Sequence, residues 1–119
     1  MRLKDIAKTL NLFFSKFGQA YLKNYVPNDA EKPYITYTVE DSELYEDNIM
    51  QVMVYGNTLE EVINIADEIE KKIGTGILVE SVEGQFISIY VRKGSPFSQP
   101  INNADSGICC YINIITKIL

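Results

Sequence analysis

The sequence predicts a single α+β domain in which two helices pack on an antiparallel or mixed sheet of about five to six strands. Three observations predict this class: two segments with apolar residues at helical spacing, several short β-branched or aromatic segments, and joins of hairpin length between most of them. The 119 residues, 46% of them apolar, suffice for one core and leave no room for a separate cofactor domain. The domain is therefore expected to span residues 1–119.

Two helices are expected, at residues 3–17 and at Leu59–Ile73. The second has a capping box, Thr58 and Glu61, at its start, and Gly74 can end it in a left-handed conformation. The stripe expected to be buried in the first helix is Leu3, Ile6, Ala7, Leu10, Phe13, Phe14 and Phe17, and in the second it is Leu59, Val62, Ile63, Ala66, Ile69 and Ile73.

Six extended segments follow from β-branched and aromatic runs between turn residues, at 20–24, 34–39, 49–55, 77–82, 85–92 and 107–119. A turn at 83–84 predicts a hairpin between the fourth and the fifth. The last segment places Ile112 and Ile114 on one face and Tyr111 on the other, so both of its faces are fairly apolar. This indicates a central strand or a face that a partner covers.

Composition excludes several function classes. The chain has no His, which removes Ser-His-Asp and Cys-His catalysis, and no apolar run reaches the roughly 18 residues of a spanning helix. Met1–Asp5 shows no signal-peptide core, so the protein is expected to work inside the cell that makes it. Cys109 and Cys110 are adjacent and should point to opposite faces, which predicts two structural thiols, one in the core and one exposed. No metal, cofactor or catalytic residue is expected.

The charge of −5 is unevenly distributed along the chain. Residues 1–25 carry five cations against Asp5, a net of +4, whereas residues 26–70 carry twelve acids against Lys32, a net of −11. Residues 71–119 return to +2. A nucleic-acid reader usually has a dense basic stripe, and this pattern has none.

Several local motifs stand in a fixed order along the chain. They are Gly18, Tyr21, Val26-Pro27, Pro33-Tyr34-Ile35-Thr36-Tyr37, the helix Leu59–Ile73, Lys93-Gly94-Ser95-Pro96-Phe97-Ser98-Gln99-Pro100 and the terminal strand. Together with the element order, these motifs resemble the tail terminator (tail-completion, or minor tail) proteins of long-tailed phages and prophages. The resemblance covers nearly the whole chain but includes no chemical signature.

The resemblance implies a structural protein that is not an enzyme. Such a subunit closes into a ring, typically a hexamer, which caps the tail tube and joins the tail to the head. Its partners would be other copies of itself, the tail tube protein and a head-completion or neck protein, with DNA passing through the lumen without specific binding. The location would be the virion, and the host cytoplasm during assembly. A neck or head-closure role on the same axis, and a ligand-binding or regulatory module outside phages, remain open.

Two segments are candidate functional sites. Lys93–Asp105 is expected to be a loop that contacts a neighbouring subunit or the adjoining tail or head protein. The contact would be made through Ser95, Pro96, Phe97, Gln99, Pro100, Ile101, Asn102, Asn103 and Asp105. Phe97 is either an anchor on that neighbour or a plug into its own core.

Residues 40–47 hold five carboxylates and are expected to form a long hairpin connection. Negative walls repel phosphate, so these acids either face the ring lumen or its rim, or form a solvated loop. The spacing does not match a calcium-binding loop. The acids are Glu40, Asp41, Glu43, Glu46 and Asp47.

Overall fold

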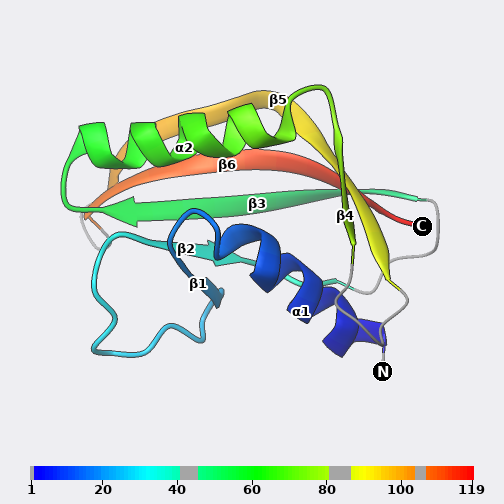
Figure 1. Ribbon diagram of the computed structural model, residues 1–119. Helices are drawn as coiled ribbons and strands as arrows, with labels where there is room; N and C mark the ends of the chain where they lie inside the picture. Colours follow the sequence, from blue (N-terminus) through cyan, green and yellow to red (C-terminus); the bar gives the residue numbers. More distant parts are fainter. Residues whose placement is uncertain (1, 41–45, 81–86, 104–106) are drawn as a thin grey trace.

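The computed structural model describes residues 2–40, 46–80, 87–103 and 107–119, and these form the expected α+β fold (Figure 1). Two helices and one six-stranded sheet make up the described part of the chain. In chain order the elements are α1 (Arg2–Phe14), β1 (Gln19–Leu22), β2 (Tyr34–Tyr37), β3 (Asp47–Gly56), α2 (Leu59–Ile73), β4 (Ile77–Glu80), β5 (Ser88–Asn103) and β6 (Gly107–Ile118). The predicted turn at 83–84 lies outside the described residues.

The sheet is mixed, with strand order β1-β2-β3-β6-β5-β4. β1 and β2 are parallel, and all other neighbours are antiparallel. β6 lies between β3 and β5 and pairs with β3 along ten residues, from Asp47↔Lys117 to Gly56↔Ile108. The central position expected for this strand from its two apolar faces is confirmed.

Both helices cover the same face of the sheet, and the core lies between them and the strands. Along β3 and β6, alternate residues point to this inner face, so Val52 and Val54 of β3 pack beside Ile112 and Ile114 of β6. α1 contributes Leu10, Phe13 and Phe14 to the core, and α2 contributes Val62, Ala66 and Ile69. The phenyl ring of Phe14 stacks on Tyr37 of β2, with 5.4 Å between ring centroids.

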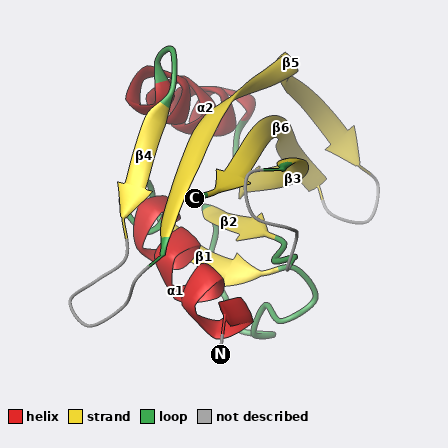
Figure 2. Ribbon diagram, turned by 90° about the vertical axis from the view of Figure 1, so that its right-hand side faces the viewer, coloured by secondary structure: helices red, strands yellow, loops and turns green. Residues whose placement is uncertain are grey.

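α1 contacts the two strands at opposite ends of the sheet order, β1 and β4. The sheet therefore curls around the helices, and α1 lies in the opening between its two edges (Figure 2). Asn11 fixes α1 to the β1 edge of the sheet. Its side-chain amide nitrogen donates to the carbonyl oxygen of Ala20 in β1 at 3.1 Å and to the hydroxyl of Tyr37 in β2 at 2.9 Å. Burial raises the pKa of Tyr37, and the bond from Asn11 opposes that rise.

The boundaries of α2 agree with the prediction, but its buried stripe is rotated. The Thr58 hydroxyl accepts from the Glu61 amide at 3.1 Å, and the Gly74 amide donates to the Glu70 carbonyl at 2.9 Å. Leu59, expected in the core, is 51% exposed, whereas Ile65 is buried. The stripe is centred on Val62, Ala66, Ile69 and Ile73, and Leu59 lies at its margin in the first turn.

α1 also differs at both ends from the prediction of a helix over 3–17. The helix ends at Phe14, and Ser15–Phe17 form a turn in which the Phe17 amide donates to the Phe14 carbonyl at 3.0 Å. Leu3 is 47% exposed because it lies at the open end of the helix, and Thr9 is buried instead, its hydroxyl bonded to the carbonyl oxygen of Asp5.

The predicted loop over Lys93–Asp105 is wrong, because β5 continues to Asn103. Its pairing with β6 passes from Lys93↔Ile114 to Ser98↔Ile112, so four residues bulge opposite Asn113. The prolines are tolerated because, in the described part of the chain, β4 pairs only with Ser88–Val91 and leaves the rest of β5 as an edge. A Cβ on Gly94 would lie 3.0 Å from the Asn113 carbonyl oxygen, so glycine permits the close approach at the bulge.

The attachment of α1 can be tested at Asn11. Asn11→Ala should lower the free energy of unfolding by about 1–3 kcal/mol, because it leaves the Ala20 carbonyl and the Tyr37 hydroxyl without their donor. Asn64→Ala is the matched control, since Asn64 is an exposed helical asparagine on α2 and the same gain in helix propensity applies. Urea unfolding of the two asparagine variants measures their stabilities. Urea unfolding of Tyr37→Phe and of the Asn11→Ala/Tyr37→Phe double variant then gives the coupling free energy between Asn11 and Tyr37. Equal stabilities of the two asparagine variants would contradict the role of Asn11.

Candidate assembly surfaces

The predicted assembly segment lies in the C-terminal half of β5, after the residues that pair with β4. Ser95, Pro96, Gln99, Pro100 and Asn102 are exposed there, and the Pro96 carbonyl accepts from the Asn113 amide nitrogen at 3.0 Å. Phe97 is half-buried and packs against the core of its own subunit, as the second of the two alternatives for this residue predicts. Ile101 is half-buried and paired with Cys109, Asn103 ends the strand opposite Gly107, and Asp105 lies outside the described residues.

The acidic segment is only partly described. Glu40 and Glu46 are exposed, while Asp41 and Glu43 lie outside the described residues. Asp47 opens β3, and its carboxylate pairs with Arg92 at 2.7 Å and with Lys117 at 3.6 Å. The charge of Asp47 is therefore compensated within the subunit. A place at the lumen or rim stays a prediction for this segment.

The structure separates these two predicted sites. Asp47 pairs with Lys117 near one end of β6, whereas Asn102 and Asn103 pair with Ile108 and Gly107 at the other end. Twelve residues of an extended strand span about 40 Å, so the two segments lie at opposite ends of the sheet.

The face of the sheet opposite the helices, here called the outer face, is rich in tyrosine. Tyr21, Tyr34 and Tyr55 come from β1, β2 and β3 and form a row, with ring centroids 5.9 and 5.0 Å apart. Tyr111 of β6 also points to this face, and Ile49 of β3 is 74% exposed on it. An outer face of an antiparallel sheet is usually polar, so this one has the character of a surface that another molecule covers.

Both cysteines are buried, which corrects the expectation that one would be exposed. Cys110 belongs to the core under the helices, and Cys109 is buried on the outer face between its strand partners Tyr55 and Ile101. Burial raises the pKa of each thiol. The two side chains do point to opposite faces, as adjacent strand residues must, and both thiols are free.

A hollow beside α1, here called the α1 groove, was not predicted from the sequence. It has a volume of about 690 Å³ and is lined mainly by apolar groups from the start of α1, the end of β2 and the segment after β1. An adjoining hollow of about 410 Å³ continues it along the helix and shares Ala7 and Tyr37. The larger hollow is lined by Leu3, Lys4, Ala7, Leu22, Lys23, Asn24, Tyr25, Tyr37, Thr38 and Val39, and the smaller also by Lys8, Asn11 and Leu12.

Neither a metal cluster nor a membrane-spanning helix is found in the described ranges. No three His, Cys, Asp or Glu side chains of residues 2–40, 46–80, 87–103 and 107–119 gather closely enough to hold a metal ion. No helix within those ranges has the length and apolar character needed to cross a bilayer. Comparison with protein-family models, with curated proteins and with solved structures found no match for this chain.

The correction at the cysteines gives a test. Cys109→Ser and Cys110→Ser should each lower the free energy of unfolding on the order of 1–3 kcal/mol, because each places a hydroxyl where no water reaches. Burial gives each thiol a higher pKa in the folded chain than in the unfolded chain, so the wild type loses stability as the pH rises through 9. The difference in unfolding free energy between the wild type and each serine variant should therefore become smaller. Denaturant titrations between pH 7 and pH 10 measure this. An undiminished stability of Cys109→Ser would contradict its burial.

Proposed function

We propose that the chain is a structural subunit of a phage or prophage virion, a tail terminator that assembles into a hexameric ring. In this role the ring caps the finished tail tube and joins it to the head, in contact with the tail tube protein and a head-completion or neck protein. DNA passes through its lumen. The motifs and element order that resemble this family, on a fold of the expected α+β class, are the basis of the proposal.

The observation that carries the assembly part of the proposal is the outer face of the sheet. A ring subunit must present apolar surface to other proteins while it stays folded alone, and this face presents a tyrosine row and the exposed Ile49 beside a complete core on the other side. Tyrosine suits such a surface because its ring adds contact area at low entropic cost while its hydroxyl tolerates water.

One observation favours a second candidate, a ligand-binding module. The α1 groove has the volume of a small-molecule site and a mostly apolar lining. A small ligand bound there would raise the melting temperature of the monomer without changing its mass.

The mass of the purified protein in solution separates the two candidates. Sedimentation and native mass spectrometry over a range of concentrations should show assembly toward a closed ring, and electron microscopy should show a central hole. Ile49→Lys should weaken assembly and leave the melting temperature of the monomer unchanged, because Ile49 is 74% exposed. Leu119→Lys, at an exposed apolar residue beyond β6, is the matched control. A wild-type chain that stays monomeric at every concentration would contradict the ring.

The acidic segment gives a separate test of the lumen. Glu40→Gln with Glu46→Gln, which keeps the ion pairs of Asp47, should leave folding intact and increase the retention of the assembled ring on DNA, because fewer negative charges repel the phosphates. The control is Asp29→Asn with Glu80→Gln, which changes the net charge by the same amount at exposed acids elsewhere. Retention on DNA, measured against salt concentration, should be higher for the Glu40/Glu46 double variant than for the Asp29/Glu80 double variant. Equal retention would remove the acidic segment from the lumen.

A further inference from the structure

We propose that the α1 groove of one copy receives the outward side of α2 from a second copy, so that the subunits join head to tail. This inference rests on the proposed ring function and adds a contact between these two surfaces to the one proposed for the outer face of the sheet. The acidic residues on the outward side of α2, here called the α2 face, are Glu60, Asp67 and Glu68.

The α1 groove combines exposed apolar side chains with unpaired positive charge. The groove is lined mainly by apolar groups, and two of its lining residues, Leu3 and Tyr25, are 47% and 77% exposed. Lys4 and Lys23 line the larger hollow and Lys8 the smaller one. None of the three lysines forms an ion pair within the described part of the chain, so their charge is available to a partner.

The α2 face has the opposite charge. Glu60, Asp67 and Glu68 are exposed and, among the described residues, form no ion pair, whereas Glu70 at the margin is paired with Lys93 at 3.4 Å. The lysines of this helix are confined to its last turn. Leu59 is half-exposed at the margin between the buried stripe and the α2 face, and it adds an apolar side chain beside that face.

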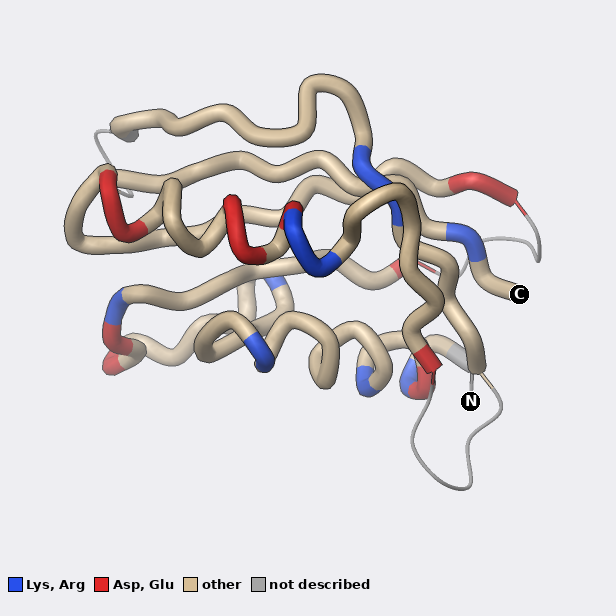
Figure 3. Tube along the Cα trace, turned by 45° about the horizontal axis from the view of Figure 1, so that its top comes forward, with Lys and Arg blue, Asp and Glu red and all other residues tan. Residues whose placement is uncertain are grey.

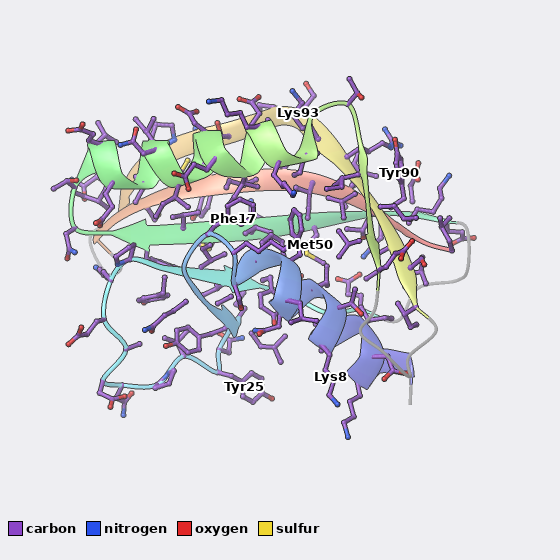
Figure 4. The ribbon with its side chains drawn as sticks, viewed as in Figure 1. Lys8, Phe17, Tyr25, Met50, Tyr90 and Lys93 are labelled. Carbon is purple, nitrogen blue, oxygen red and sulfur yellow. The ribbon has the colours of Figure 1, made fainter. Side chains whose placement is uncertain are left out.

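The two surfaces lie on opposite sides of the molecule. α2 lies in the upper part of Figure 1, while Lys8 and Tyr25 project from the bottom of the same view in Figure 4. The tube in Figure 3 shows acidic segments along most of α2 and mainly basic ones along α1. A subunit cannot therefore bring its own α2 face to its own groove, and the contact has to be made between copies.

Head-to-tail contact follows from this arrangement. A two-fold contact through either surface would place like charges opposite one another, which is unfavourable, whereas a heterologous contact places acid against base. A heterologous contact uses each surface once in every subunit, and it closes into a ring when the rotation between neighbours divides a full turn. A second copy is the occupant that the charges favour, because the same chain carries the complementary surface.

A charge-swap experiment tests the contact. Lys4→Glu with Lys23→Glu makes the groove acidic and changes the net charge from −5 to −9, and Asp67→Lys with Glu68→Lys makes the α2 face basic and changes it to −1. Each double variant alone should associate at least about tenfold more weakly than the wild type, since like charges then meet at every contact. An equimolar mixture of the two should assemble again, because each altered surface meets its altered complement.

Matched controls hold the net charge constant. Lys16→Glu with Lys72→Glu gives −9, and Asp29→Lys with Glu80→Lys gives −1, all at exposed residues outside the groove and the α2 face. The controls should assemble as the wild type does, and circular dichroism should show every variant folded. If the wild type forms rings and the groove variant forms them equally well, or if the mixture does not recover, the contact is wrong while the ring function stands. A wild type that never assembles overturns both.

Discussion

The packing of α1 against both edges of the sheet is the interaction on which the rest of the structure depends. A strongly curved open sheet leaves a gap between its first and last strands, and here α1 fills that gap by contacting β1 and β4. Leu10, Phe13 and Phe14 complete the core from this position. The same helix forms one wall of the groove, so the element that closes the core also shapes the candidate contact with a second copy.

Much of the fold could be predicted because local signals and tertiary packing agree in it. The cap at Thr58, the apolar stripe and the stop at Gly74 define α2 within the sequence itself. The two apolar faces of β6 predict either a central strand or a face that a partner covers, and the strand is central. β5 could not be predicted over its full length, because Gly94, Pro96 and Pro100 are turn residues by composition. They are acceptable in a strand because, among the described residues, β5 has no partner on its β4 side beyond Val91, and because the strand bulges opposite Asn113.

The candidate sites were less predictable than the fold, since they depend on which segments meet in space. The surplus of positive charge in residues 1–25 is visible in the sequence, but the groove also needs Thr38 and Val39, which follow β2. The burial of Cys109 could not be predicted from the sequence for the same reason. Alternation assigns it correctly to the outer face, yet only the pairing with Tyr55 and Ile101 shows that this position is covered.

The strand order has a consequence for the synthesis of the chain. β1, β2 and β3 form one half of the sheet, β5 and β4 form the other, and in the described residues only β6 joins them. β6 is also the last of these strands to leave the ribosome. Until it does, β3 and β5 lack the strand that pairs with both of them, and α2 lacks the β6 residues against which it packs. The described sheet is therefore complete only when β6 lies between β3 and β5, so the last strand of the chain determines when both halves of the sheet become one layer.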